Sequence, residues 1–230
     1  VPHMVPMIPA GQYTLLDFYE AGGIPVMMKE LASILMLDGI TCTGHTSKEN
    51  IDEFKNKNTD VIRGLSNPVH NRGGIAVLKG NIAPDGAVTK PSAIPEKALL
   101  FRGPAKIYES EQDALIGIRA KQVHEGEVVV IRNEGPKGGP GMPEMYKVMK
   151  VLVGMNLGSK VCVITDGRFS GSNNGCFVGH ICPEALDDGP IAYLQDGDVI
   201  TVDVLNGIIE ADVDFRKRRK EVVRKEVEQV

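Results

Sequence analysis

The sequence predicts an α/β fold in which a β-rich body follows a short helical arm. From about Val61 onward, short apolar stretches are divided by Gly, Pro, Asn and Asp, which is typical of many short strands. Before that point the apolar residues recur at helical spacing. The length of 230 residues, with 42% hydrophobic and 24% charged residues, is sufficient for one substantial core. We therefore expect an arm over residues 1–58 and a body over residues 59–230.

The arm is expected to contain helices over Tyr13–Glu20 and Ile24–Leu37. The second helix follows a Gly-Gly pair and carries Pro25 in its first turn, where a missing backbone N–H costs nothing. A third, shorter helix is expected from Glu49.

In the body, β-branched runs predict strands and amphipathic charged runs predict helices. Strands are expected at Gly74–Leu78, Ala87–Thr89, Ala105–Glu109, Glu127–Ile131, Val161–Thr165, Gly189–Leu194 and Val199–Leu205. Helices are expected at Glu111–Ala120, from about Met142 and from Phe215, with a helical turn at Pro183–Leu186. Asn206-Gly207 predicts a hairpin turn.

Charge and hydropathy exclude some classes of partner. A formal net charge of -4 disfavours nucleic acid, because its phosphates attract basic surfaces. No apolar stretch approaches the roughly 20 residues that cross a bilayer, so we expect no membrane partner and a cytoplasmic location. The 4 cysteines lack CxxC spacing, which argues against a disulfide framework, a zinc ribbon or a complete iron-sulfur ligand set.

A polar, glycine-rich loop follows the strand expected at Val161–Thr165. It contains Asp166, Arg168, Ser170 and His180, and loops of this kind on a rigid scaffold often carry functional sites. A serine nucleophile of the G-x-S-x-G type is excluded, because two residues separate Gly167 from the serine. A Ser-His-Asp triad stays open but is less favoured. Ionisation of the serine would need a strong neighbouring positive charge.

A second glycine-rich loop, at Asn133–Gly141, precedes the helix expected from Met142. It places Pro143 and Glu144 in the first turn of that helix, where the carboxylate either stabilises the helix dipole or binds a cation. The order GxxxxGK[ST] and the order GxGxxG are both absent, so a nucleotide site is not supported. Arg168 and a cation held by Glu144 could supply the charge that the serine needs.

Several long motifs in this order resemble the IlvD/Edd dehydratase family. They are GGIAVLKGNIAPDGAV at 73–88, GPAKIYESEQDA at 103–114, EGPKGGPGMPEM at 134–145, ITDGRFSG at 164–171, GHICPEA at 179–185 and DGDVITVDV at 196–204. The resemblance covers nearly everything from Met7 to Val213.

This resemblance implies a hydro-lyase that removes water from a 2,3-dihydroxy carboxylic acid to give a 2-keto acid, with an iron-sulfur cluster and Mg²⁺. It implies that Ser170 abstracts the C2 proton and that Glu144 is a magnesium ligand. The cluster would act as Lewis acid on the departing 3-hydroxyl, and Mg²⁺ would hold the carboxylate and the 2-hydroxyl. Asp166, Arg168 and Asn133 would bind substrate or support its ligands, with a purely structural role equally open.

The resemblance also implies the architecture: a swivelling β/β/α domain with a barrel-like sheet, preceded by the tail of an N-terminal domain. The cysteine ligands of the cluster and the other magnesium ligands belong to that N-terminal domain, so the partner expected is that domain or a subunit supplying it. The 230-residue chain alone is expected to bind no cluster and to be inactive. The completed protein is expected to be a homo-oligomer.

The substrate is less sharply indicated. The segments TDGRFSG and GHICPEA favour branched-chain dihydroxy acids and hence branched-chain amino-acid biosynthesis, whereas NPVH at 67–70 and TKPSA at 89–93 resemble sugar-acid (aldonate) dehydratases of the same family. Residues 171–174 fit neither pattern cleanly. An alternative of another class is a swivel domain that binds or regulates without catalysis.

Overall fold

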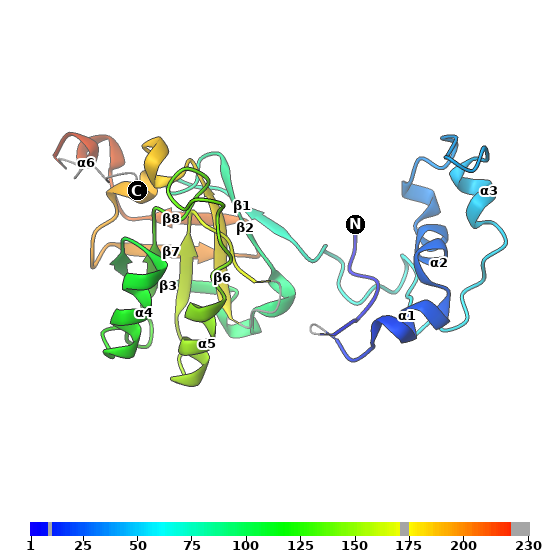
Figure 1. The fold of residues 1–230 in the computed structure, drawn as a ribbon, viewed down its shortest axis with the longest axis horizontal. Coiled ribbons are helices and arrows are strands. Elements are labelled where there is room, and N and C mark those ends of the chain that lie inside the picture. Colours follow the sequence, from blue (N-terminus) through cyan, green and yellow to red (C-terminus); the bar gives the residue numbers. More distant parts are fainter. Residues whose placement is uncertain (9–10, 171–174, 222–230) are drawn as a thin grey trace. The chain divides into compact units, whose positions relative to one another are not determined.

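The computed structural model describes residues 1–8, 11–170 and 175–221, which form two compact units, Val1–Gly74 and Ile75–Val230 (Figure 1). The first unit is helical, and the second is built on a sheet with helices on one face.

The helices of the first unit are α1 (Leu15–Ala21), α2 (Gly23–Glu30) and α3 (Ser47–Ile51), with a 3₁₀ turn η1 (Ala32–Ile34). Helix α1 starts with a capping box in which Thr14 and Asp17 satisfy each other's backbone N–H groups. Gly22, at φ +123°, then allows α2 to follow without a loop. Helix α2 is shorter than the predicted Ile24–Leu37. Its last turn is tied to the next segment by Lys29 Nζ, which donates to the carbonyl of Asp52 at 2.6 Å.

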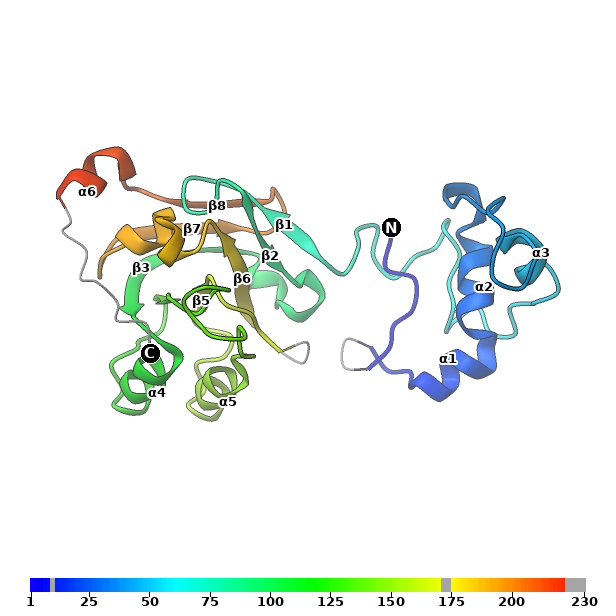
Figure 2. The same cartoon turned by 45° about the horizontal axis from the view of Figure 1, so that its top comes forward.

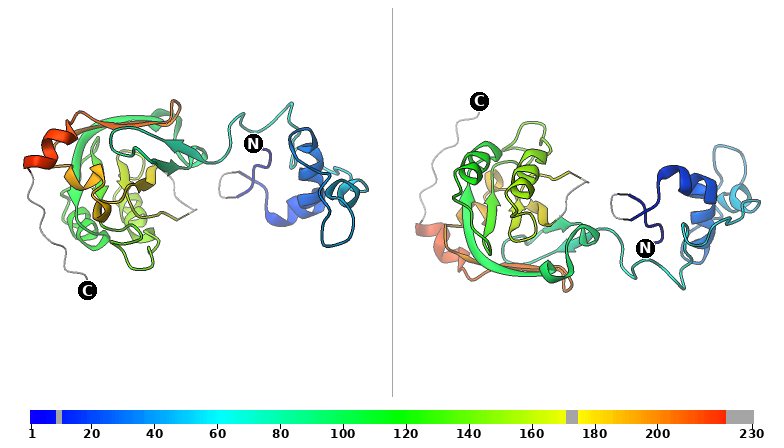
Figure 3. Two further views of the ribbon diagram at one scale, coloured as in Figure 1. Left: turned by 90° about the horizontal axis from the view of Figure 1, so that it is seen from above. Right: turned by 90° about the horizontal axis from the view of Figure 1, so that it is seen from below.

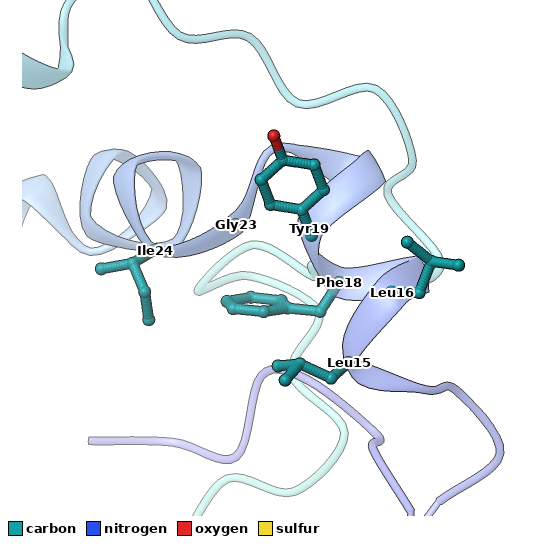
Figure 4. Close-up of a pocket in the computed structure, with 6 residues that line it drawn as sticks. All are labelled: Leu15, Leu16, Phe18, Tyr19, Gly23 and Ile24. Atoms are coloured by element: carbon teal, nitrogen blue, oxygen red, sulfur yellow. The ribbon is translucent and has the colours of Figure 1, made fainter.

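The core of the first unit is small. Its largest cluster of buried apolar residues is Phe18, Ala21, Val26, Val61 and Ile62. Many other large apolar side chains of the unit are exposed, and some line an apolar pocket of about 520 Å³ on α1 and α2 (Figure 4). The residues that line it are Leu15, Leu16, Phe18, Tyr19, Gly23 and Ile24. None of the helices in the described part of the chain has the length and apolar character needed to span a bilayer.

One sheet organises the second unit. Its strands are β1 (Ala76–Leu78), β2 (Gly86–Thr89), β3 (Leu100–Tyr108), β4 (Val128–Ile131), β5 (Cys162–Thr165), β6 (Cys176–Cys182), β7 (Val199–Asp203) and β8 (Ile208–Ala211). Their spatial order is β1-β2-β6-β5-β4-β3-β7-β8 (Figure 2). The four central strands β6, β5, β4 and β3 are parallel, and the outer strands pair antiparallel.

The two ends of this sheet meet. Lys79, just after β1, donates its backbone N–H to the carbonyl of Gly207 at 2.9 Å and accepts from Ile209 N at 3.0 Å. The side chain of Asn81 then bonds both the carbonyl and the N–H of Ala211, at 2.7 and 2.8 Å. The sheet therefore curves into a nearly closed barrel (Figure 3), which confirms the predicted α/β class with a barrel-like sheet.

Two apolar clusters lie on either side of the central strands. One fills the barrel, with Leu78, Val130, Ile164, Val178 and Ile200 among its members. The other lies between β4, β5 and the helices α4 (Glu111–Arg119) and α5 (Tyr146–Gly154), which pack side by side on the outer face (Figure 1). The remaining helical segments are η2 (Pro91–Ala93), η3 (Glu96–Ala98), η4 (Ala185–Asp187), η5 (Pro190–Tyr193) and α6 (Phe215–Glu221).

Two sequence predictions about the strands of this unit are wrong. The stretch Gly189–Leu194 is not a strand but the 3₁₀ turn η5, because Pro190 starts a turn whose carbonyls are held by the guanidinium of Arg132. Strand β6 was assigned to the central loop, because glycines and a histidine interrupt its apolar pattern. Most of the helix predicted from Phe215 beyond Glu221 lies outside the described residues.

Candidate functional site

The candidate site lies at the carboxyl ends of the parallel strands β3, β4 and β5. Because these ends share one edge of the sheet, Glu109, Asn133 and Asp166 come together there. The side-chain amide of Asn133 donates to the carbonyl of Glu109 at 3.2 Å and to its carboxylate at 3.0 Å. Asn133 adopts φ +65°, a left-handed conformation that asparagine tolerates better than most residues, and this turns the chain into the glycine-rich loop.

Asp166 is a buried hub of backbone hydrogen bonds. It is 1% exposed, and its carboxylate accepts from the N–H groups of Glu134 at 3.0 Å, Asn133 at 3.1 Å and Ala185 at 2.9 Å. Burial raises the pKa of this carboxyl, and the three N–H groups act in the opposite direction. The carboxylate thus joins the loop after β4 to the segment after β6.

Glu144 lies opposite Arg168 in an isolated parallel β-bridge. The N–H of Met145 donates to the carbonyl of Arg168 at 3.0 Å, and Arg168 Nε donates to the carbonyl of Met142 at 2.8 Å. The prediction of a helix from Met142 is therefore wrong: the chain is still extended at Glu144, and α5 begins only at Tyr146. Glu144 and Arg168 are both exposed.

Ser170 follows Arg168 by two residues and is half-buried. Between them, the ring of Phe169 packs edge-on against Phe177 of β6, with centroids 5.1 Å apart, which fixes this segment on the sheet. Residues 171–174, which fit neither substrate pattern, lie outside the described residues. The exposed His180 donates its backbone N–H to the carbonyl of Gly167 at 2.8 Å, and no described contact joins its ring to Ser170 or Asp166.

Glu184 is a site residue that sequence reasoning did not single out. Although only 5% exposed, it faces no described cation at hydrogen-bond distance. Instead its carboxylate accepts from the backbone N–H of Lys137, at 2.9 and 3.1 Å to its two oxygens, and of Gly138 at 3.0 Å. Its position inside the GHICPEA motif was the one available signal.

Two of the four cysteines are too deeply buried to hold a cluster at this site. Cys162 and Cys176 lie fully buried inside the barrel with their Sγ atoms 3.1 Å apart, and burial raises the pKa of the Cys162 thiol well above its usual range. Within the described residues, no group of three or more His, Cys, Asp or Glu side chains is arranged to hold a metal ion. The exposed carboxylate of Glu144 has the oxygen chemistry that Mg²⁺ prefers and would fit as one ligand of such an ion.

Comparison with known proteins matches both units to one family. The profile of the dihydroxy-acid/6-phosphogluconate dehydratase C-terminal domain matches residues 60–230, and that of the N-terminal domain matches residues 1–50. The chain belongs to this dehydratase family. Membership confirms the resemblance drawn from the motifs at 134–145, 164–171 and 179–185.

Relatives within the family are named dihydroxy-acid dehydratase. The protein of Acetivibrio thermocellus is 47% identical over 226 residues, which cover 96% of this chain and 41% of the relative. Those of Methanothermobacter thermautotrophicus and Sulfurisphaera tokodaii are each 46% identical, covering 94% and 95% of this chain and 39% and 40% of their own lengths. The chain thus spans about two fifths of the length of these family members.

Proposed function

We propose that this chain is the C-terminal part of a hydro-lyase that converts a 2,3-dihydroxy carboxylic acid into a 2-keto acid. The observation that carries the proposal is the bridge between Glu144 and Arg168, which brings the PGMPEM and TDGRFSG segments to one edge of the sheet. The names of the relatives support a dihydroxy acid as substrate and branched-chain amino-acid biosynthesis as the pathway.

In this proposal the ionised hydroxyl of Ser170 accepts the proton from C2, and hydroxide leaves from C3 and is protonated to water. The resulting C2–C3 enol takes up a proton at C3, loses the proton of its 2-hydroxyl and so becomes the 2-keto acid. Magnesium, when bound at Glu144, supplies positive charge that holds substrate oxygen atoms. The guanidinium of Arg168, exposed at the same edge, adds positive charge near Ser170 that favours its ionised form.

Asn133 and Asp166 complete the proposed set as residues that shape the site, since both are engaged by hydrogen bonds within the protein. The iron-sulfur cluster of the family is proposed to be held by cysteines outside this chain, because Cys162 and Cys176 are buried in the barrel and the four cysteines lack CxxC spacing. The completed enzyme is proposed to be a homo-oligomer located in the cytoplasm.

We also propose that residues 1–58 are the tail of the N-terminal domain, with the swivelling body over residues 59–230. The rest of that domain is the proposed occupant of the exposed apolar surface on α1 and α2, because residues 1–50 match an N-terminal profile and the relatives extend over more than twice this length. Burial of such side chains would supply the docking energy.

A sugar acid is the second candidate substrate. It is favoured by the NPVH and TKPSA segments and by the family description, which also names 6-phosphogluconate dehydratase. Anaerobic assembly of this chain with the N-terminal part of a relative, assayed on 2,3-dihydroxyisovalerate and on gluconate side by side, separates the two. Turnover of neither compound, with the cluster present by absorption, would support a binding module instead.

The role of Ser170 is tested in the same assembly. Ser170→Ala is expected to lower kcat by at least about 10²-fold, the usual contribution of a general base. Ser159→Ala, which removes an exposed hydroxyl from a turn outside the site, is the matched control. Loss of less than about threefold in Ser170→Ala would remove the serine from the mechanism.

A further inference from the structure

The loop that leads to Glu144 is held by two buried carboxylates rather than by apolar packing. Between Asn133 and Gly141 it contains four glycines and two prolines, so it has few side chains to bury. Asp166 binds its first two N–H groups, and Glu184 binds the N–H groups of Lys137 and Gly138. Because a donor shielded from water is costly to leave unpaired, these contacts restrict the shape of the loop.

We call the carboxylates of Asp166 and Glu184, together with the loop N–H groups that they bind, the clamp. The clamp fits closely around Glu184. A Cβ atom on Gly135 would lie 2.4 Å from Glu184 Oε2, so only glycine leaves room for the carboxylate at this position. Asp166 also accepts from the N–H of Ala185, the residue after Glu184, and so fixes the backbone that carries the second carboxylate. The two acids therefore act as one unit that spans the segments after β4, β5 and β6.

A continuous path runs from this clamp to Glu144. Beyond Gly138 the loop makes two hydrogen bonds within itself. Gly139 N donates to the carbonyl of Gly135 at 2.8 Å, and Met142 N donates to the carbonyl of Gly139 at 2.6 Å. Met142 lies two residues before Glu144, and its carbonyl accepts a hydrogen bond from Arg168 Nε. These bonds place the backbone at Glu144, which lies before α5 and outside its helical hydrogen bonds.

From this geometry we infer that Glu184 is a positioning residue that, together with Asp166, fixes the glycine-rich loop and thereby aims Glu144 at a divalent cation. The inference rests on the proposed role of Glu144. Outer contacts of this kind typically account for 10–100-fold in metal affinity.

Two variants disturb the clamp in different ways. In Glu184→Gln, an NH₂ group replaces one oxygen next to the N–H of Lys137, so two donors face each other. In Gly135→Ala, the added methyl group pushes the unchanged carboxylate away. Asp187→Asn is the matched control, because it breaks the exposed ion pair with Lys137 that joins the same two segments but adds little stability.

The first measurement is hydrogen exchange in the 230-residue chain. Both clamp variants are expected to speed exchange of the Lys137 and Gly138 amides at least about tenfold, while Asp187→Asn leaves it within about twofold. Amides of β4 serve as the internal reference, so a global loss of stability is recognised by their faster exchange. Unchanged exchange at the loop in both variants would overturn the inference.

The second measurement is Mn²⁺ binding, followed by electron paramagnetic resonance, in the protein completed with an N-terminal part. Both clamp variants are expected to weaken Mn²⁺ binding about tenfold or more, and the Mg²⁺ concentration for half-maximal activity is expected to rise equally, with kcat at saturating Mg²⁺ within about threefold. Faster exchange of the Lys137 and Gly138 amides, together with unchanged Mn²⁺ affinity, would overturn the inference. If the completed protein dehydrates none of the acids tested, the proposed function fails, and exchange and Mn²⁺ binding still decide this point.

Discussion

The two units of this protein differ in how far their large apolar side chains are buried. In the second unit most large apolar side chains of β4, β5, α4 and α5 are buried in two clusters, while Ile116, Tyr146 and Val153 are exposed. In the first unit Leu16 is 63% exposed and Tyr19 75% exposed beside an apolar pocket. Exposed apolar surface of this kind is typical of interaction sites. The contrast teaches that the second unit carries two large cores of its own, while the first has a small core and leaves apolar side chains of α1 and α2 exposed.

Truncating one leucine in each unit tests this contrast most directly. Leu152→Ala removes a fully buried side chain of α5 and is expected to lower the free energy of unfolding by about 2–5 kcal/mol. Leu16→Ala on α1 is expected to change it by no more than about 0.5 kcal/mol. Guanidinium titrations of the 230-residue chain measure both, and similar losses would abolish the contrast.

A steric test of barrel closure gives the next largest effect. A Cβ on Gly80 would lie 2.0 Å from the carbonyl oxygen of Ile209, where β8 meets the end of β1. Gly80→Ala is therefore expected to cost about 1–3 kcal/mol of stability, as overpacking usually does. Gly154→Ala is the control: its Cβ meets nothing within 4 Å, and alanine in α5 should stabilise the chain by up to about 1 kcal/mol. Equal effects of the two substitutions would argue against closure at Gly80.

A third test of the contrast uses the exposed Leu16 in the protein completed with an N-terminal part. If the N-terminal part covers α1, Leu16→Ala should destabilise the assembly by about 1–3 kcal/mol while leaving the 230-residue chain unaffected. Thermal unfolding of both forms, with Leu16→Ala beside the wild type, makes the test. A substitution that is silent in both forms would mean that some other surface meets the N-terminal part.

The smallest expected effect is a pH dependence in the second unit. Burial raises the pKa of Glu134, with the charges of Glu111 and Asp166 adding to the rise. A carboxyl with a raised folded-state pKa holds its proton more tightly when folded, so its contribution to stability falls as pH rises from the ordinary to the raised pKa. Glu134→Gln removes this loss. Its stability relative to wild type is therefore expected to improve from about pH 4 to pH 7 in urea titrations, and a flat or opposite trend would contradict the assigned cause.

Elements with a strong local pattern were predictable from the sequence. Strands β4 and β5 are continuous apolar runs, α4 has a clear amphipathic repeat, and the hairpin at Asn206-Gly207 uses a turn-specific pair. The two glycine-rich loops were also recognisable as the places where polar groups gather. These features depend on neighbours in the chain.

Features that depend on distant partners were not predictable. Strand β6 exists because β5 and β2 pair with it on either side, and η5 is shaped by Arg132, which is 59 positions from Ile191. Helix α5 begins only at Tyr146 because the N–H of Met145 donates to the backbone carbonyl of Arg168. For the same reason Glu184 was overlooked: its place in the GHICPEA motif does not show that its carboxylate binds the N–H groups of Lys137 and Gly138, which lie 46 or more positions away.

The contact between Asn81 and Ala211 has a consequence for the chain's behaviour outside the native state. The two residues are separated by 130 positions, so the barrel seam closes only after nearly the whole second unit has been synthesised. Until then β1 presents an unpaired edge, which is a template for pairing with other chains. A fragment that ends before Ala211 is left with this seam open, and aggregation rather than loss of a single contact is the expected outcome.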